Sequence, residues 1–470
     1  MKNMTLEKIA EACGGRYIGP DAAGQMEIAG AVIDSRQVQP GYLFVPIRGE
    51  RVDGHRFIPQ VFEKGACAVL SDHALEDPQG PYIQVEDTPA ALKAIAEYYR
   101  STLSIPVIGI AGSVGKTSTK EMIASVLGQK FNVLKTEGNF NNEIGLPLTI
   151  LRIREEHQAA VIEMGISDFG EMHRLAKIAR PDICVMTNIG LCHLENLKSR
   201  DGILKAKSEM FDYLKEDGVI ILNGNDDKLS TIGTVHGVEP LRYFVEDGSA
   251  PRRNSGYLIT ASDLENRGLA GMDATLHFPE EDRRVSIPIP GAHNVYNALA
   301  GACAGRVLGL SNDEIVRGIE SAETIGGRAN LLSEGGVGII DDCYNANPVS
   351  MKASLDVLAE CPGRKIAVLG DMGELGAEEK ELHAQVGAYA AEKKIDVLFC
   401  SGKLSAFMAE AAREGGCETH YAADKEALVA ELLPMIRKGD TILVKASHFM
   451  GYSEVVEAIR KYIREQKLAE

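Results

Sequence analysis

The stretch that most constrains this chain is residues 109–119, Gly-Ile-Ala-Gly-Ser-Val-Gly-Lys-Thr-Ser-Thr, which directly follows the apolar run Ile105-Pro-Val-Ile108. A strand that runs into glycines and then into a helix forms a cradle for phosphate, because its backbone N–H groups and the helix dipole both favour an anion. Lys116 is placed to reach the β- and γ-phosphates of a nucleotide, and Thr117 is placed to bind Mg²⁺. The stretch therefore predicts a site for ATP or GTP.

The glycine spacing departs from the commonest phosphate-binding pattern. Ile110 stands where the first glycine is usual, and the glycines fall at Gly109, Gly112 and Gly115. The alternative, an ordinary glycine-rich turn with an exposed lysine, explains less, because strand, turn, Lys-Thr and helix coincide. We expect the nucleotide to contact Gly112, Ser113, Gly115, Lys116, Thr117 and Ser118.

Length and composition exclude several classes of protein. A chain of 470 residues exceeds one ordinary core, and 45% hydrophobic with 25% charged residues is typical of a globular protein. The formal net charge of −17 argues against a nucleic-acid-binding surface. No uncharged apolar run approaches the ~18 residues that cross a bilayer, and nine scattered cysteines without a Cys-x-x-Cys pair indicate a reducing compartment. We expect a cytoplasmic protein that neither binds nucleic acid nor inserts into a membrane.

Strand-like and helical patterns alternate along most of the chain, which is typical of parallel sheets covered by helices. The first ~95 residues indicate a compact mixed unit that begins with a helix at Leu6–Ala12. The middle region alternates strands and helices, although residues 256–290 interrupt the rhythm and predict a small antiparallel excursion. From Arg328 the alternation restarts and indicates a second doubly wound, Rossmann-like unit. We predict an α/β fold with three domains, at residues 1–100, 101–325 and 326–470.

Two polar residues follow apolar runs of the middle region. Glu163 ends the run that begins at Ala159, and His193 lies just past the run at 183–187. The carboxyl ends of parallel strands form the ligand-binding edge of such sheets, so both side chains are expected beside the phosphate cradle. Glu163 suits Mg²⁺, although a carboxylate that caps a turn is the alternative. A lone histidine is more often structural, and Lys207, on a predicted helix over 200–215, has the pattern of a solvent-exposed lysine.

Two further segments are rich in polar side chains. Thr136–Pro147 contains Asn139, Asn141 and Asn142, and Asp341–Pro348 contains two carboxylates, a tyrosine and two asparagines. Ordinary turn chemistry would account for both. Their density beside a nucleotide site favours contact with phosphate or substrate instead.

Together these segments resemble the Mur ligases, the ATP-dependent amide-bond-forming enzymes of peptidoglycan synthesis, over essentially the whole chain. Asp34-Ser-Arg36 and Gly41–His55 are similar to that family's uridine-nucleotide domain. The phosphate cradle, Gly138–Pro147, Glu163-Met-Gly165 and Gly291–Leu299 are similar to its ATPase domain, and Gly327-Arg328 with Asp341–Pro348 to its carboxyl-terminal domain. Ser118 stands where threonine is commoner, a mild departure.

The resemblance implies roles at the matching positions. Mg²⁺ would be held by Thr117, Glu163, His193 and Lys207, the last as a carbamate, which reverses the interpretation from its pattern alone. ATP would also contact Asn294, Asn297, Arg328 and Asp342. The UDP-sugar substrate would contact Ser35, Arg36, Arg48 and Asp53. Independently of the resemblance, Lys445 and Ser447 end a strand-like run, where they could meet the carboxylate of the acceptor; a buried strand end with a lysine reaching out to solvent is the alternative.

The implied reaction has two steps. ATP phosphorylates the terminal carboxylate of a UDP-N-acetylmuramoyl-tripeptide, and the amine of D-Ala-D-Ala attacks the acyl phosphate. Lys116 and Mg²⁺ would offset charge on the transferring phosphoryl group. Two alternatives stay open: a sister amide ligase, such as the enzyme that adds the third peptide residue or a folylpolyglutamate synthetase-like enzyme, and a nucleotide-binding switch that makes no product.

Overall fold

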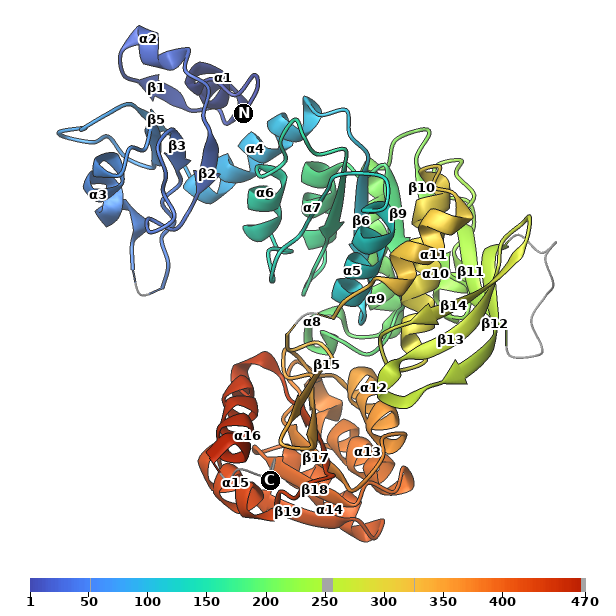
Figure 1. The fold of residues 1–470 in the computed structure, drawn as a ribbon. Helices are drawn as coiled ribbons and strands as arrows, with labels where there is room; N and C mark the ends of the chain where they lie inside the picture. Colours follow the sequence, from blue (N-terminus) through green and yellow to red (C-terminus); the bar gives the residue numbers. More distant parts are fainter. Residues whose placement is uncertain (51, 247–256, 325, 466–470) are drawn as a thin grey trace.

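The computed structural model describes residues 1–50, 52–246, 257–324 and 326–465, which form three sheet-containing α/β parts in chain order (Figure 1). The central part carries the largest sheet. The N-terminal part (blue) and the C-terminal part (orange to red) lie at different sides of it. Within the described residues, no helix combines the length and the apolar character needed to cross a membrane. The predicted α/β class with three parts is confirmed.

The N-terminal part is a five-stranded sheet in the order β1-β5-β4-β3-β2. Strands β2 to β5 run parallel, so their carboxyl ends share one edge, and β1 pairs antiparallel with β5. The predicted helix at Leu6–Ala12 (α1) is confirmed. The other elements are Arg16–Ile18 (β1), Asp21–Gly24 (α2), Gly30–Val32 (β2), Tyr42–Phe44 (β3), Gly54–Phe57 (η1), Ile58–Glu63 (α3), Ala68–Ser71 (β4) and Tyr82–Gln84 (β5).

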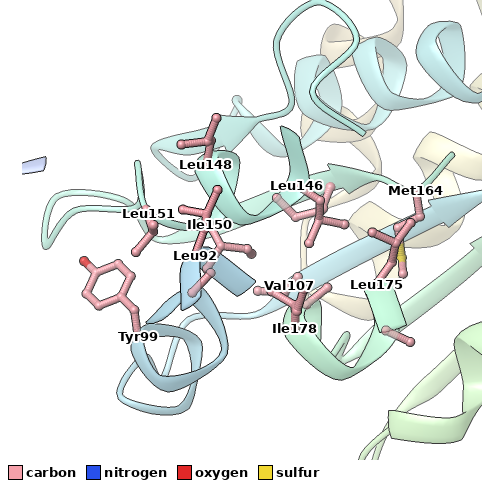
Figure 2. Close-up of a cluster of buried hydrophobic side chains, with 14 of the residues drawn as sticks. Leu92, Tyr99, Val107, Leu146, Leu148, Ile150, Leu151, Met164, Leu175 and Ile178 are labelled. Carbon is pink, nitrogen blue, oxygen red and sulfur yellow. The ribbon is translucent and has the colours of Figure 1, made fainter. Parts of the chain in front are cut away.

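Helix α4, Thr88–Ser101, joins the N-terminal and central parts through a continuous apolar cluster. Figure 2 shows Leu92 and Tyr99 of this helix beside Ile150 and Leu151, residues of the central part. The Tyr99 hydroxyl donates to the Ile153 carbonyl at 2.6 Å. Apolar burial of this kind stabilises the two parts together, and a domain boundary at residue 100 stays a prediction.

The central sheet has nine strands in the order β14-β13-β12-β11-β10-β9-β6-β8-β7. Strands β6 to β12 pair in parallel, and β12, β13 and β14 pair antiparallel. The predicted antiparallel strands therefore exist, but they extend the central sheet instead of leaving it, because β12 pairs with β11. The strands are Val107–Ala111 (β6), Val133–Lys135 (β7), Ala159–Glu163 (β8), Ile183–Met186 (β9), Val219–Asn223 (β10), Leu241–Val245 (β11), Tyr257–Asn266 (β12), Met272–His277 (β13) and Asp282–Ile287 (β14).

Helices cover both faces of the central sheet, each over its own apolar cluster. The helix predicted over 200–215 ends earlier, at Ser208, and continues as a 3-10 turn. The Gly138–Pro147 segment is not wholly a loop, since its end starts helix α6. The elements are Lys116–Leu127 (α5), Gly145–Ile150 (α6), Glu171–Ala179 (α7), Leu194–Leu197 (α8), Arg200–Ser208 (α9), Glu209–Tyr213 (η2), Leu229–Thr231 (η3), Gly268–Ala270 (η4), His293–Val307 (α10) and Asn312–Glu320 (α11).

The C-terminal part has six strands in the order β15-β16-β20-β17-β18-β19, parallel except for β15. Asn347 caps helix α12 by accepting from the Ser350 N–H, and Pro348 takes the first helical position. The strands are Asn330–Glu334 (β15), Val337–Asp341 (β16), Lys365–Gly370 (β17), Val397–Ser401 (β18), Glu418–Ala422 (β19) and Thr441–Lys445 (β20). The helices are Pro348–Ala359 (α12), Gly376–Glu378 (η5), Glu379–Glu392 (α13), Ser405–Glu414 (α14), Lys425–Leu432 (α15), Leu433–Met435 (η6), His448–Met450 (η7) and Ser453–Glu465 (α16).

Candidate active site

A cavity of about 580 Å³ lies where the central and C-terminal parts meet. Most of the residues predicted for nucleotide, metal and acceptor line it, although they are spread over more than 300 positions of sequence. They are Ser113, Gly115, Lys116, Thr117, Ser118, Asn139, Asn141, Asn142, Glu163, His193, Asn297, Arg328, Asp342 and Lys445. Those outside its lining are Gly112, Lys207, Asn294 and Ser447, together with the N-terminal candidates Ser35, Arg36, Arg48 and Asp53.

The glycines of the phosphate cradle are required by packing and by backbone conformation. A Cβ on Gly112 would lie 1.9 Å from the Thr187 hydroxyl oxygen. Gly115 has φ of 80°, a left-handed conformation that glycine adopts without strain, and it directly precedes helix α5. The cradle therefore has the predicted strand, turn and helix, and the amino end of α5 faces the cavity.

Asn188 fixes the cradle from the neighbouring strand, a role that the sequence interpretation missed. Its side-chain amide accepts from the Val114 N–H at 3.0 Å and donates to the Val114 carbonyl at 3.0 Å. Its backbone carbonyl accepts from the Ser113 N–H at 3.0 Å. Asn188 follows the apolar strand β9, so the strand-end argument that selected Glu163 would have found it, and Asn223 at the end of β10 likewise.

Glu163 is a buried carboxylate held by neutral groups. One oxygen accepts from the Thr117 hydroxyl at 2.9 Å, and the other accepts from the Asn141 side-chain amide at 2.8 Å. Glu163 is only 1% exposed, and within the described ranges it forms no ion pair. Burying a charged carboxylate costs less free energy when a cation lies beside it. The Glu163 and Thr117 oxygens are the donor types that Mg²⁺ prefers.

Lys207 is buried, so the solvent-exposed position indicated by its pattern alone is wrong. It is 1% exposed on helix α9, and among the residues described its amine has no hydrogen bond or ion pair. Burial lowers the pKa of Lys207 to about 8, and repulsion from Lys116 acts in the same direction. Its face was readable from the sequence, because Ile203, Ala206 and Met210 share it at helical spacing.

His193 lines the cavity and contacts the C-terminal part. Its Nδ1 lies against the carboxylate of Glu374, and this contact lowers the pKa of Glu374. Both residues have positive φ, 49° for His193 and 62° for Glu374. Gly376 lies against the backbone of Leu194 and Glu195 in the same region. No sequence pattern indicated Glu374, because the contact depends on how two separate folded parts meet.

The C-terminal wall of the cavity is internally paired. The Lys445 amine lies 2.6 Å from the Asp342 carboxylate and donates to the Asn345 carbonyl at 3.1 Å. Asp342 also accepts from the Ser354 hydroxyl at 2.6 Å and from the Ala329 N–H at 3.1 Å. The guanidinium of Arg328 lies 3.9 Å from the centre of the Tyr344 ring. These contacts orient the wall before any ligand binds.

Several candidate side chains hold the protein's own backbone or each other. Asn294 is buried on helix α10 of the central part and accepts from the Asn297 amide at 2.8 Å. Asn297 in turn accepts from the Thr119 hydroxyl. Asn142 accepts from the Gly145 N–H at 2.9 Å, and Asn139 is exposed on the same loop. Ser447 is buried and accepts from the Gly373 N–H at 2.9 Å. Their contacts with ligand stay predictions.

The N-terminal candidates form a separate group at the edge where parallel strands end. Arg36 pairs with Asp34, and the Ser35 carbonyl accepts from Lys64 at 2.8 Å. Arg48 bridges two carboxylates, at 2.6 Å from Asp72 and 2.9 Å from Asp53. This edge lies on a different part of the molecule from the cavity, so a substrate that uses both must be long.

Three family descriptions match the chain in sequence order. The Mur ligase family, catalytic domain, matches residues 27–100. The Mur ligase middle domain matches residues 110–305, and the Mur ligase, glutamate ligase domain, matches residues 327–448.

Curated relatives and solved structures match over nearly the full length. A UDP-N-acetylmuramoyl-tripeptide–D-alanyl-D-alanine ligase of Bacillus subtilis is 40% identical, covering 97% of this chain and 98% of that relative. The Escherichia coli enzyme of the same name is 36% identical, covering 98% and 99%. A crystal structure of MurF from Acinetobacter baumannii aligns with a TM-score of 0.87 at 31% identity, covering 97% of this chain and 99% of that one. MurF ligase from Thermotoga maritima, in complex with ADP, aligns with a TM-score of 0.80 at 29% identity, covering 93% and 98%.

Proposed function

The chain belongs to the Mur ligase family, and we propose that it uses ATP to join D-alanyl-D-alanine to the terminal peptide carboxylate of a UDP-N-acetylmuramoyl-tripeptide. The observation that carries the proposal is the composition of the cavity. One wall is a phosphate cradle and the other is a second α/β unit with its own charged groups. A transfer between two bound substrates needs both walls, whereas a nucleotide switch needs only the first.

The chemistry explains why ATP is consumed. A carboxylate does not react with an amine at neutral pH, because its oxygen is a poor leaving group; phosphorylation supplies a good one. The cradle N–H groups and Lys116 hold the nucleotide phosphates and offset the charge that develops during transfer. The amine of the dipeptide then attacks the acyl phosphate through a tetrahedral intermediate and releases phosphate. Enclosure between two walls protects the acyl phosphate from water.

We assign the Mg²⁺ ligands to the central wall. The buried Glu163 carboxylate and the Thr117 hydroxyl fit that ion, and His193 lines the same cavity. A bound Mg²⁺ ion would offset negative charge on the nucleotide phosphates. In this arrangement Glu374 contacts Nδ1 of His193, so Nε2 is the nitrogen that would bind the ion.

We propose that Lys207 carries a carbamate, formed by CO₂ on its neutral amine. A pKa near 8 instead of 10.5 raises the neutral fraction at pH 7 roughly 300-fold. The carbamate would turn a buried cation into a carboxylate-like ligand beside Lys116, which lies close enough to repel the protonated amine. Burial without a partner therefore favours the modified side chain.

The remaining contacts follow the two ends of the substrates. We propose that the UDP-sugar lies at the N-terminal edge with Ser35, Arg36, Arg48 and Asp53, while Asn139, Asn141 and Asn142 contact its peptide end. ATP contacts the cradle together with Asn294, Asn297, Arg328 and Asp342. The acceptor dipeptide lies against Lys445 and Ser447. The dependence on ATP and a nucleotide-linked sugar supports a cytoplasmic location.

Mass spectrometry of the reaction product tests this function directly. The protein is incubated with Mg-ATP, UDP-N-acetylmuramoyl-tripeptide and D-Ala-D-Ala, and ADP release is followed in parallel. The expected product is the tripeptide extended by two alanines, with ADP release that requires the dipeptide. A product extended by one amino acid on a shorter peptide would indicate the third-residue-adding sister ligase. ADP release that ignores every amine would indicate a nucleotide switch and contradict the proposal.

A further inference from the structure

His55, Asp72 and His73 gather in the N-terminal part, away from the cavity. One ligand atom from each lies within 4.8 Å of the other two. The Asp72 carboxylate oxygen Oδ1 lies 2.6 Å from His73 Nδ1 and 3.4 Å from His55 Nε2. Strand β4 ends just before Asp72, while His55 comes from the turn η1, so the fold brings together residues 17 positions apart. We propose that these three side chains form a binding site for a divalent transition-metal ion, with Zn²⁺ as the best match.

The donor set identifies the class of metal. Two imidazoles and one carboxylate are the ligands that Zn²⁺ and related first-row ions use when a further position is left for water or another ligand. Mg²⁺ and Ca²⁺ prefer oxygen donors alone. The site therefore differs in chemistry from the Glu163 and Thr117 pair of the cavity.

Asp53 orients His55 as a supporting carboxylate does at a metal centre. Its Oδ1 lies 2.6 Å from His55 Nδ1. A carboxylate can only accept, so Nδ1 carries the proton and Nε2 presents its lone pair toward Asp72. The Asp72 N–H lies 3.4 Å from Nε2, at the long limit of a hydrogen bond, so a metal would replace a weak contact.

Arg48 holds both carboxylate oxygens of Asp72. Its Nε donates to Oδ2 at 2.6 Å, and its Nη2 donates to Oδ1 at 2.9 Å. Ligating carboxylates are commonly fixed by such outer donors. At His73 the metal would take the place of the Nδ1 proton, as metal binding to histidine generally releases protons.

Space and charge at the cluster also suit a cation. A cavity of about 280 Å³ adjoins it and is lined by both imidazoles, which leaves room for water on the metal. With neutral imidazoles, and among the described groups alone, the four carboxylates beside the cluster exceed the two guanidinium groups by two charges, the amount that a divalent ion supplies. The carboxylates are Asp53, Asp72, Glu76 and Asp77, and the guanidinium groups are Arg48 and Arg56.

Calorimetric titration of the full-length protein with Zn²⁺, in excess Mg²⁺ to saturate hard-cation sites, tests the proposal. His73→Ala removes one ligand on a side chain that is 50% exposed, so the fold should tolerate it. His173→Ala is the matched control, because His173 is 47% exposed and pairs with Asp212 at 2.6 Å but belongs to no three-membered cluster of potential metal ligands among the described residues. Asp53→Asn removes the negative charge that supports His55 and leaves the three ligands in place.

We expect the wild-type protein and His173→Ala to bind one Zn²⁺ with equal affinity. His73→Ala should lose this binding, and Asp53→Asn should weaken it by about 10- to 100-fold. A crystal soaked in Zn²⁺ should show anomalous scattering between the two imidazoles and Asp72. Equal Zn²⁺ binding by wild-type and His73→Ala would overturn the site, as would equal losses in His73→Ala and His173→Ala.

Discussion

The two walls of the large cavity carry similar numbers of charged groups but treat them differently. On the central wall and directly behind it, Lys116, Glu163 and Lys207 form no ion pair within the described part of the chain, and Lys116 donates only to the Gly112 carbonyl. On the C-terminal wall, Lys445 and Asp342 neutralise each other at 2.6 Å. The charges of the central wall therefore lack ion-pair partners among the described residues, whereas the C-terminal wall pairs Lys445 with Asp342 and holds Arg328 over the Tyr344 ring.

This difference indicates that the central wall serves ligand binding and catalysis, whereas the C-terminal wall serves structural stability. Unpaired buried charge is unfavourable in the empty protein, and it is offset when phosphate and metal arrive, so the central wall gains most from ligands. Paired charge keeps a fixed geometry whether or not a ligand is bound. Substitutions on the central wall should therefore change catalysis, and substitutions on the C-terminal wall should change stability first.

Lys207→Ala should give the largest effect. Loss of a carbamate that ligates the metal should raise the activation free energy by about 4 kcal/mol, which lowers kcat roughly 10³-fold. Steady-state ADP release measures it, and short carboxylates should restore part of the activity. Lys205→Ala, exposed on the same helix, is the control and should be active. Full activity of Lys207→Ala would remove Lys207 from the reaction.

Lys116→Ala should follow closely. Removing a cation that stabilises the transferring phosphoryl group should raise the activation free energy by about 3–4 kcal/mol, which lowers kcat 10²–10³-fold. Its only described hydrogen bond is to a carbonyl, so unfolding by urea should be unchanged. Near-normal turnover in a folded variant would contradict the phosphate-binding role.

Lys445→Met should change stability where Lys116→Ala does not. It leaves Asp342 without its cation in a wall where the two side chains are 3% and 13% exposed, so unfolding free energy should fall by about 3 kcal/mol. Adding Asp342→Asn should recover much of the loss. Lys393→Met, which breaks an exposed pair with Asp356, should cost below about 1 kcal/mol. Equal losses from Lys445→Met and Lys393→Met would show that the wall is not specially paired.

The pH dependence of carbamate formation should expose the unpaired lysine itself. A folded-state pKa near 8 means that the neutral amine rises about tenfold between pH 7 and pH 9 and then levels off. Carbon-13 NMR with labelled bicarbonate, normalised to dissolved CO₂, measures the rate at Lys207. An ordinary exposed lysine would rise about 100-fold over the same range without levelling, and that result would contradict the burial argument.

Ser447→Ala should give the smallest effect. Its hydroxyl accepts from Gly373 and lies 3.4 Å from the Ala346 carbonyl, so its loss removes about 1 kcal/mol of loop ordering at the acceptor side. The KM for D-Ala-D-Ala should rise about fivefold more than the KM for ATP. Equal changes in both would mean that this strand end supports the fold and that the acceptor lies elsewhere.

Residues of the central wall could be predicted from the sequence because the end of a strand is a local feature of the chain. An apolar run followed by a polar residue predicted Glu163, and the same rule extends to Asn188 and Asn223, which it could have selected. The burial of Lys207 was missed because its charge suggested exposure, although its position places it on the apolar face of the helix. Strands β1 and β5, of three residues each, are too short for a visible alternation.

Two contacts of the site could not be predicted from any sequence pattern, because each depends on how distant segments of the chain pack together. Glu374 reaches His193 only because the C-terminal part docks in one orientation, and the Lys445–Asp342 pair joins residues 103 positions apart. Such distances depend on the packing of complete sheets. The resemblance to a family supplied candidate residues there, but not their partners.

The apolar cluster that continues through helix α4 opposes any separation of the N-terminal part from the central part. Since the N-terminal and central parts share one interior, separating them would expose Leu92, Tyr99 and their neighbours to water at a large free-energy penalty. The C-terminal part has interior clusters of its own and meets the rest mainly through partly buried side chains such as Leu191 and Leu194. The N-terminal and central parts are thus coupled by a shared apolar interior, and a displacement of the C-terminal part is the one that would leave that interior intact. In the proposed function, such a displacement would keep the sugar nucleotide beside the phosphate cradle and would move the acceptor relative to both.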